Sequence, residues 1–523
     1  MRDTFCSYYT DSKDITSYMI AKLGIVNNDV ILEPSAGEGI FVDEILKTNN
    51  PVHIDALEMN REAISILKKK YKNIDSVVVR ETDTLLDEQL DLYSVSQLWL
   101  KQTDTLFDKQ LDAFSALGGH YSKVIGNPPY GAWQDYKKRE ALKKKFAGHY
   151  VKETYSLFLL RCISVLRIQG KLSFIIPDTY LFLNMHSRLR TLILTNTKID
   201  EILIFPSKFF PGVSFGYSNL SIITLERCNK SEALNNTFKV IQGFRTTSEF
   251  ALLLGKAPVY PERLQVFTFM QKDILSNEQC RVILADSRTS TLLTNSPKKL
   301  GDVADVVTGF YTGDNLRFIK AVDKGVKGAK NYEVVEQDQV FSCTSLYGIT
   351  DVKEGYVRYI KSASKRRYVR QKDEWFVRWD QDTIDFYNNN KKSRFQNSSF
   401  YFKTGIGIPM VKSSSIRAFL MQDRVFDQSI VGIFPKDNSK LYYLLALMNS
   451  DAINNLIHTI NPTANNSANY IRQLPYIEPT QEVLSEIISK VRELISLEES
   501  MEYDAADCLH KEINFIIGEI YEK

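Results

Sequence analysis

The sequence predicts an α/β fold: a doubly wound, mostly parallel sheet of seven strands, followed by an α+β region and C-terminal helices. Short apolar runs alternate with helix-like stretches from about Asp14 to Cys228. The runs are apolar at consecutive positions, which is typical of parallel strands covered by helices on both faces. A sheet of this kind binds ligands at the carboxyl ends of its strands, so polar residues there are candidates for a functional site.

The expected strands are seven short apolar runs, with helices between them. The runs lie at residues 30–32, 52–57, 77–79, 123–125, 172–176, 202–205 and 220–225. Asn60 is a suitable cap for a helix over residues 61–67, and residues 153–167 have apolar side chains at helical spacing. Another helix is expected over residues 14–23. Alternation of this length indicates the doubly wound sheet.

The composition is that of a globular protein. Of its 523 residues, 44% are hydrophobic and 25% are charged, and this length suits roughly two to four domains. It contains no apolar run long enough to cross a membrane and does not start with a signal peptide, so we expect a cytoplasmic protein. The six cysteines form no Cys-x-x-Cys pair, so no metal site or disulfide framework is expected. With a net charge of +3, any nucleic-acid surface must be a local patch.

The loop after the first strand suits close contact with a ligand. It contains Glu33, Ser35, Ala36 and Gly37 within residues 33–39. Glycine lets the backbone approach a ligand closely. The loop lacks the Gly-x-Gly-x-x-Gly dinucleotide pattern, so a binding role for it depends on polar residues at the ends of the next strands.

The next two strand ends add acidic residues. Glu58 lies 19 positions after Gly39, about the spacing at which an acid binds a ribose diol in dinucleotide-binding sheets. Met59 is placed to lie against an adenine ring, and Asp83 to accept a hydrogen bond from an adenine amino group. Each residue alone is more often structural. Together and in this order they predict a nucleoside site.

The fourth strand runs into Asn127, Pro128, Pro129 and Tyr130, which we call the catalytic turn. Proline fixes φ and lacks an N–H group, so carbonyls of this turn stay available. The Asn127 side chain and the Pro128 carbonyl can together hold both hydrogens of a planar NH2 group, while Tyr130 stacks on the ring that carries it. The turn therefore predicts attack by an amine or amide nitrogen. The alternative is a proline-stiffened strand exit.

A duplicated segment complicates one assignment. Residues 82–91 recur almost unchanged as residues 103–112. Two copies are too few for a solenoid and are explained by a local duplication that lengthens one loop. Asp104 thus rivals Asp83, which we favour because it closely follows an apolar strand.

The order of these motifs resembles the gamma class of N6-adenine DNA methyltransferases, the TaqI-like group of restriction-modification and phage-defence systems. The resemblance covers almost the whole chain and is strongest in the first 230 residues or so. Besides the loop, the acidic strand ends and the catalytic turn, the matching segments are Tyr8, Tyr9 and Thr10, then residues 174–177, 209–212, 300–309, 461–463 and 470–475. Two positions depart from the family pattern, since Glu33 stands where many members have Asp, and Thr84 stands where an aromatic residue is usual.

This resemblance implies a class I S-adenosylmethionine-dependent fold and a set of roles. S-adenosyl-L-methionine would contact Tyr9, Thr10, Glu33, Ser35, Ala36, Gly37, Glu58, Met59 and Asp83. The target adenine of double-stranded DNA would be flipped out of the duplex and stacked on Tyr130 and Phe210, with Phe209 and Phe215 as rivals of Phe210. A separate restriction endonuclease or defence subunit is an expected partner.

A basic segment further along the chain is a candidate for DNA contact. Residues 361–403 hold eleven basic and five acidic residues, interleaved with aromatic rings, a mixture that suits phosphate contact and base stacking. The alternative is a solvated loop beside an aromatic core. The candidate residues are Lys365, Arg366, Arg367, Arg370, Lys391, Lys392 and Arg394. Basic residues at 137–139 and 143–145 are further phosphate candidates.

Three domains are expected: a catalytic domain over residues 1–245, a DNA target-recognition domain over 246–480, and a helical segment over 481–523 with two helices between about 482 and 521. Other functions also suit the catalytic turn, namely N-methylation of RNA or of a protein glutamine. A non-catalytic DNA-specificity subunit is a third alternative. The long basic-aromatic region favours DNA, and the intact catalytic turn favours an enzyme.

Overall fold

The computed structural model describes residues 12–93, 119–131, 135–210, 219–255, 257–370, 372–411, 415–461 and 466–522. The chain forms two compact units, Met1–Val282 and Ile283–Lys523. Among the described residues, none of the helices is both long enough and apolar enough to cross a bilayer.

Unit 1 is built on one nine-stranded sheet with strand order β3-β2-β1-β4-β5-β7-β6-β8-β9. Its strands are β1 (Val30–Glu33), β2 (His53–Glu58), β3 (Val77–Glu81), β4 (Tyr121–Gly126), β5 (Leu166–Pro177), β6 (Thr197–Pro206), β7 (Asn219–Arg227), β8 (Thr237–Gln242) and β9 (Gln265–Met270). Strands β1 to β5 run parallel to one another, whereas β7 is antiparallel to both β5 and β6. The predicted mostly parallel α/β sheet is confirmed, and β8 and β9 extend it beyond the seven expected strands.

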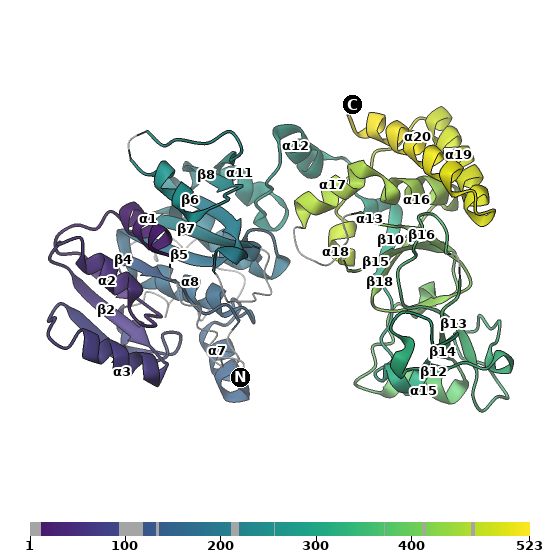
Figure 1. Cartoon of the computed structure of the whole chain (residues 1–523), viewed down its shortest axis with the longest axis horizontal. Coiled ribbons are helices and arrows are strands. Elements are labelled where there is room, and N and C mark those ends of the chain that lie inside the picture. The colour runs from purple at the N-terminus through teal and green to yellow at the C-terminus, as the bar shows by residue number, and fades with distance from the viewer. Residues whose placement is uncertain are drawn as a thin grey trace. The chain divides into compact units, whose positions relative to one another are not determined.

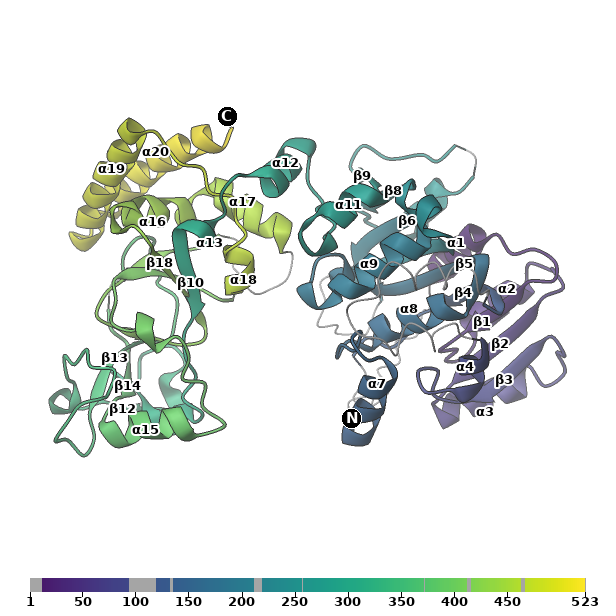
Figure 2. The ribbon, with the colours of Figure 1, turned by 180° about the vertical axis from the view of Figure 1, so that it is seen from behind.

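Helices cover both faces of this sheet, as Figures 1 and 2 show with α1 in front in the first view and α9 in the second. The helices are α1 (Lys13–Leu23), α2 (Ile40–Leu46), α3 (Arg61–Lys70), α4 (Glu88–Tyr93), α7 (Tyr136–Lys145), α8 (Thr154–Val165), α9 (Ser187–Asn196), α10 (Lys230–Leu234) and α11 (Gln271–Ser276). Local sequence sets their ends: the Asn60 side chain accepts from the Glu62 N–H at 3.0 Å to begin α3, and Gly24 ends α1 in the left-handed region at φ +59°.

The core of unit 1 lies against the central strands. Every residue of β4 is buried, and α8 is buried along its whole length. Lys123 is the charged member of β4, and its ammonium group donates to the Leu23 carbonyl at 2.8 Å. Burial on both faces is why these strands read as continuous apolar runs rather than alternating ones.

Unit 2 contains two smaller sheets and a helical part. The strands are β10 (Ala304–Thr308), β11 (Ile319–Ala321), β12 (Glu333–Val334), β13 (Tyr356–Ile360), β14 (Trp375–Arg378), β15 (Gly405–Pro409), β16 (Phe419–Met421), β17 (Val425–Phe426) and β18 (Ile430–Pro435). They form the sheets β10-β18-β15-β16 and β12-β11-β14-β13-β17. The expected α+β architecture is therefore present.

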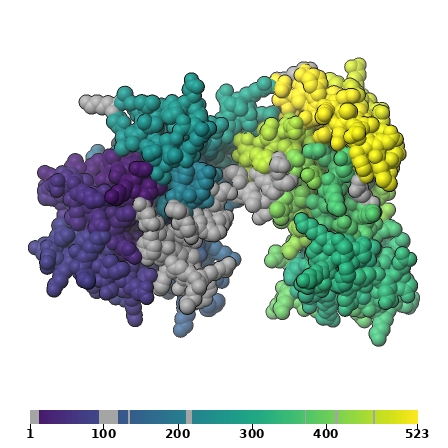
Figure 3. Space-filling view, in the orientation of Figure 1, coloured from purple at the N-terminus to yellow at the C-terminus, as the bar shows by residue number. Residues whose placement is uncertain are grey.

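The helices of unit 2 end in a long antiparallel pair. They are α12 (Ser287–Asn295), α13 (Leu300–Val303), α14 (Asn315–Phe318), α15 (Gln381–Asn389), α16 (Leu441–Asn449), α17 (Asp451–Ile460), α18 (Ala468–Ile471), α19 (Gln481–Glu499) and α20 (Tyr503–Glu522). In Figure 3, α19 and α20 form the yellow surface at the end of the chain. The two predicted C-terminal helices are confirmed, and residues 500–502 connect them.

The expected domain boundaries need correction. The boundary after residue 245 would separate β8 from β9, which pair along their whole length from Thr237–Met270 to Gln242–Gln265, so the first unit extends to Val282. The segment 481–523 is not a separate body, because α19 and α20 pack on α16 within unit 2. The sequence patterns near residues 246 and 481 mark the start of a new secondary-structure element. They do not mark a boundary between hydrophobic cores.

Candidate active site

The carboxyl ends of β3, β2, β1 and β4 lie next to one another in the sheet and bring the predicted site together. Glu33 at the end of β1 is in register with Ala56 on β2, and Glu58 at the end of β2 is in register with Glu81 on β3. Leu32 on β1 pairs with Val124 on β4. The strand order therefore places the loop of residues 33–39, which we call the cofactor loop after its predicted role, between the two acidic strand ends and the catalytic turn.

Glu58 organises the loop that follows β1. Its Oε2 accepts a hydrogen bond from the Gly37 N–H at 2.8 Å, and its Oε1 accepts from the N–H groups of Met59 and Asn60, each at 2.8 Å. Gly37 has φ +53°, a conformation that L side chains rarely adopt. Glycine at this position and the fixed carboxylate together determine the conformation of the loop.

Glu33 presents a buried acceptor at the end of β1. Its side chain is 1% exposed, and burial, followed by the charge of nearby Glu58, holds its pKa well above the ordinary range. Its Oε2 has no hydrogen-bond partner among the described residues, which is costly in a buried position. A cationic or hydrogen-bond-donating ligand would satisfy this oxygen. The acidic side chains thus fit S-adenosylmethionine, which carries an ammonium group, a sulfonium group and a ribose diol.

Asp83 lies just beyond β3 and is paired with a residue that was not predicted for the cofactor site. Its Oδ1 accepts from the Leu85 N–H at 3.1 Å, and its Oδ2 lies 2.7 Å from Nζ of Lys138 on α7. The same Nζ lies 4.0 Å from the Met59 sulfur. Lys138 therefore contacts both residues that are predicted to bind adenine. The basic run at residues 137–139 had instead predicted a contact with DNA phosphate.

The catalytic turn is held from both sides. Ser35 Oγ donates to the Asn127 carbonyl at 3.2 Å, linking the cofactor loop to the turn. Thr154 Oγ1 at the start of α8 donates to the Pro129 carbonyl at 2.6 Å. The Tyr130 hydroxyl donates to Asn127 Oδ1, which orients the amide oxygen. Tyr130 is only 2% exposed, so stacking on a target ring would require the turn to open.

The predicted base-stacking residues differ in accessibility. Phe210 is 4% exposed, and its ring stacks on Phe205 with centroids 6.3 Å apart. Phe209 is half-buried and stacks on the same ring at 5.8 Å. Phe209 is more accessible to a base than Phe210 is, which favours the rival assignment. Tyr9, Thr10, Asp104 and Phe215 lie outside the described residues.

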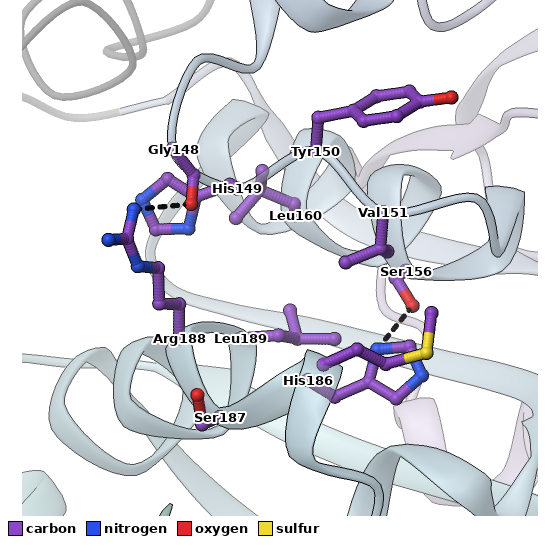
Figure 4. Close-up of a pocket in the computed structure, with 11 residues that line it drawn as sticks. Gly148, His149, Tyr150, Val151, Ser156, Leu160, His186, Ser187, Arg188 and Leu189 are labelled. Carbon is purple, nitrogen blue, oxygen red and sulfur yellow. Dashed lines mark hydrogen bonds between the residues drawn. The ribbon is translucent and has the colours of Figure 1, made fainter. Parts of the chain in front are cut away.

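A cavity of about 170 Å³ lies between α8 and the segment that begins α9 (Figure 4). His186 forms part of its wall, within 3.1 Å of Ser156 Oγ and 3.0 Å of the Tyr155 hydroxyl. Burial lowers the pKa of His186 to about 3, so its ring is neutral near pH 7. Arg188 at the rim donates to the Gly148 carbonyl at 2.6 Å. The cavity is lined by Ser156 and Leu160 of α8, the helix whose Thr154 contacts the catalytic turn.

The basic segment of unit 2 divides into internal and exposed residues. The Arg366 guanidinium is bound by Glu498 and Asp507 at 2.6 and 2.9 Å, and Arg370 donates to the Ser362 carbonyl at 2.8 Å. Arg367 donates to Ser415 Oγ at 3.3 Å. Lys365, Lys391, Lys392 and Arg394 are exposed. The candidates that face solvent are therefore these last four.

Most aromatic rings of the same segment are not a stacking surface. The rings that are nearly fully buried are Tyr368, Trp375, Trp379 and Tyr401, each at most 3% exposed. Trp375, Trp379 and Tyr401 belong to the hydrophobic core of unit 2, so the predicted base stacking by the segment's aromatics is wrong for these buried rings. Burying apolar surface stabilises the fold by roughly 25 cal/mol per Å². The aromatic side chains of this segment are therefore explained by their contribution to the core.

Known proteins similar to this chain include DNA methyltransferases. Residues 13–210 match the Eco57I restriction-modification methylase family. The type II methyltransferase M.AccI of Acinetobacter calcoaceticus is 23% identical over 345 residues, which are 64% of this chain and 56% of M.AccI. M.HindII of Haemophilus influenzae is 23% identical over 482 residues, covering 84% of this chain and 82% of M.HindII. The chain thus spans about half of the first relative and most of the second.

Two further likenesses are more distant. The adenine-specific methyltransferase BrxX of Escherichia coli O9:H4 is 21% identical over 380 residues, covering 69% of this chain and 28% of BrxX. The solved structure of a nuclease-deletion mutant of the Type ISP restriction-modification enzyme LlaGI has a TM-score of 0.52 and 11% identity, covering 94% of this chain and 47% of that one. The family match and the curated relatives confirm the resemblance to restriction-modification methyltransferases that the motif order predicts. The likeness to LlaGI concerns the fold alone.

Proposed function

We propose that the protein transfers a methyl group from S-adenosylmethionine to N6 of an adenine flipped out of double-stranded DNA, at a specific sequence, as the modification component of a restriction-modification or related defence system. The hydrogen bond from Ser35 to the Asn127 carbonyl carries this proposal, because it joins the cofactor loop to a turn suited to an amine. The resemblance to the gamma class and the adenine-specific name of one relative support N6 of adenine as the acceptor.

The chemistry assigned to the turn is stabilisation of positive charge on nitrogen. The lone pair of the adenine amine is delocalised into the ring, so the free amine is a poor nucleophile. Asn127 Oδ1 and the Pro128 carbonyl accept its two hydrogens and favour tetrahedral geometry as charge develops, which is preorganised dipolar stabilisation. When bound, S-adenosylmethionine supplies the electrophilic methyl group. Positioning of the amine in line with it supplies much of the rate, and the methylated amine loses its proton to water without a strong base.

The test is expression of the wild type and Asn127→Ala in a host lacking adenine methylation, followed by single-molecule sequencing of the host DNA. We expect N6-methyladenine in one defined motif with the wild type and none with Asn127→Ala. Cofactor titration is the control, since Asn127→Ala should bind S-adenosylmethionine almost as the wild type does.

Other results would contradict the proposal. If the wild type binds the cofactor but leaves DNA unmarked, an RNA or protein-glutamine acceptor, which suits the same turn, becomes the better assignment. If the wild type binds no cofactor, a non-catalytic DNA-specificity subunit is favoured. Loss of both cofactor binding and transfer in Asn127→Ala would indicate a misfolded variant or a wrong assignment of the turn.

Unit 2 is proposed to read the DNA sequence. Its exposed basic residues Lys365, Lys391, Lys392 and Arg394 suit phosphate contact, which dominates affinity without specifying sequence. A separate endonuclease or defence subunit is a proposed partner, by analogy with related restriction-modification systems.

A further inference from the structure

We propose that Lys138 acts as a clasp over the adenosine half of the cofactor site, meaning that it holds the Asp83 carboxylate in place and closes the edge of the site. This inference rests on the proposed function, because it assumes that Asp83 and Met59 contact the adenine of S-adenosylmethionine. Lys138 belongs to α7, the helix that follows the turn and that projects from the body of unit 1 in Figure 1.

The position of the Lys138 ammonium group is the first observation. It lies 2.7 Å from Asp83 Oδ2 and 4.0 Å from the Met59 sulfur, so it contacts both residues that are predicted to bind the adenine ring. Its side chain is only 20% exposed, although its neighbour Lys137 on the same helix is exposed. The Lys138 side chain is therefore largely buried, with its charged end in contact with the Asp83 carboxylate.

The Asp83 carboxylate has room for both partners. A carboxylate offers about four lone-pair sites, and the structure uses one for the Leu85 N–H and one for Lys138. An adenine amino group can therefore bind Asp83 while Lys138 stays in place. Lys138 then acts as a positioning residue that holds the carboxylate and closes the site, rather than as a competitor of the ligand.

The second observation is that α7 is fastened to the same segment at another point. Lys145 in its last turn contacts Asp91 at 2.9 Å, and the fully buried Arg161 of α8 contacts the same carboxylate at 2.7 Å. Arg161 also donates to the Asp87 carbonyl at 2.8 Å. Lys138 and Lys145 of α7 thus hold the segment from Asp83 to Asp91 at two points, which fixes the position of the Asp83 carboxylate.

The experiment measures the dissociation constants of S-adenosylmethionine and S-adenosylhomocysteine by calorimetry, without DNA, for the wild type and Lys138→Ala. We expect both ligands to bind about tenfold more weakly to the variant, as loss of one charge-assisted contact implies. Lys138→Arg should restore most of the affinity. Lys137→Ala is the matched control on the same helix and should bind as the wild type does.

Salt dependence separates a clasp from a purely structural role. The pair is partly exposed, so raising the salt from about 50 to 500 mM should shrink the difference between the wild type and Lys138→Ala, while the melting temperatures of the unliganded proteins stay alike. If Lys138→Ala binds S-adenosylmethionine as tightly as the wild type does, or more tightly, the proposed role of Lys138 is wrong. If the wild type itself does not bind, the proposed function falls as well, and the two failures are thus distinguishable.

Discussion

At the scale of single residues, unit 1 stabilises the catalytic turn with buried polar groups whose charge state matters. His186 is 0% exposed and lies within hydrogen-bonding distance of Ser156 and Tyr155. Burial, followed by the charge of Arg190, depresses its pKa from 6.5 to about 3. The folded protein therefore resists protonation of this ring far more than the unfolded chain does.

This shift predicts a specific dependence of stability on pH. The contribution of neutral His186 is fully present above pH 6.5, the ordinary pKa, and is lost as the pH falls from 6.5 toward about 3. Each pH unit below 6.5 costs about 1.4 kcal/mol, so the free energy of unfolding should fall by about 2 kcal/mol more in the wild type than in His186→Gln between pH 7 and 5. Urea unfolding at both values measures this difference. Parallel pH profiles of the two proteins would show that the ring is not kept neutral.

At the scale of elements, Arg366 shows how a basic residue can serve the fold. Its guanidinium binds Glu498 on α19 and Asp507 on α20 and lies 4.6 Å from the Tyr503 ring centroid. These contacts raise its pKa above the ordinary value. The Glu498 side chain is only 3% exposed, so Arg366 is the group that compensates its buried charge.

Removing that group should destabilise unit 2. Arg366→Ala leaves Glu498 buried without its guanidinium partner, and we expect the free energy of unfolding to fall by about 2–3 kcal/mol. Lys365→Ala, the exposed neighbour, is the matched control and should change it by less than about 0.5 kcal/mol. Denaturant unfolding compares the two. If Arg366→Ala changes the free energy of unfolding only slightly and binds DNA more weakly, Arg366 is a DNA-binding residue instead.

The elements themselves show what sequence patterns can predict. The seven strands and the capped α3 follow from apolar runs and from Asn60, because burial and capping are local properties of a segment. The strand-end acids were predictable for the same reason. The pairing of Lys138 with Asp83 was not, because it joins positions far apart in the sequence and depends on where α7 docks. In the sequence, a lysine that contacts a DNA phosphate cannot be distinguished from one that contacts a carboxylate of the same protein.

At the scale of the whole molecule, each unit has its own core and its own proposed task. The aromatic residues of 361–403 could not be divided between core and surface from the sequence, since a buried ring and a stacking ring have the same composition. The basic residues on the loop after α15 are different. Tyr311 and Arg394 exchange backbone hydrogen bonds at 3.3 and 2.9 Å, and the Gln396 side chain donates to the Gly309 carbonyl at 3.0 Å. The loop is thus held in place while its charges remain exposed.

A preorganised basic loop should contribute to DNA affinity without choosing the sequence. Each phosphate contact that is lost lowers the slope of log affinity against log salt by about one, so Lys391→Ala/Lys392→Ala should lower it by about two and weaken binding to cognate and unrelated duplexes alike. Lys511→Ala, which removes an exposed lysine of α20, should leave the slope unchanged. Fluorescence anisotropy across a salt series measures both. An unchanged slope in the double variant would mean that DNA contacts other exposed residues, and a loss confined to one sequence would mean that these lysines contact bases rather than phosphates.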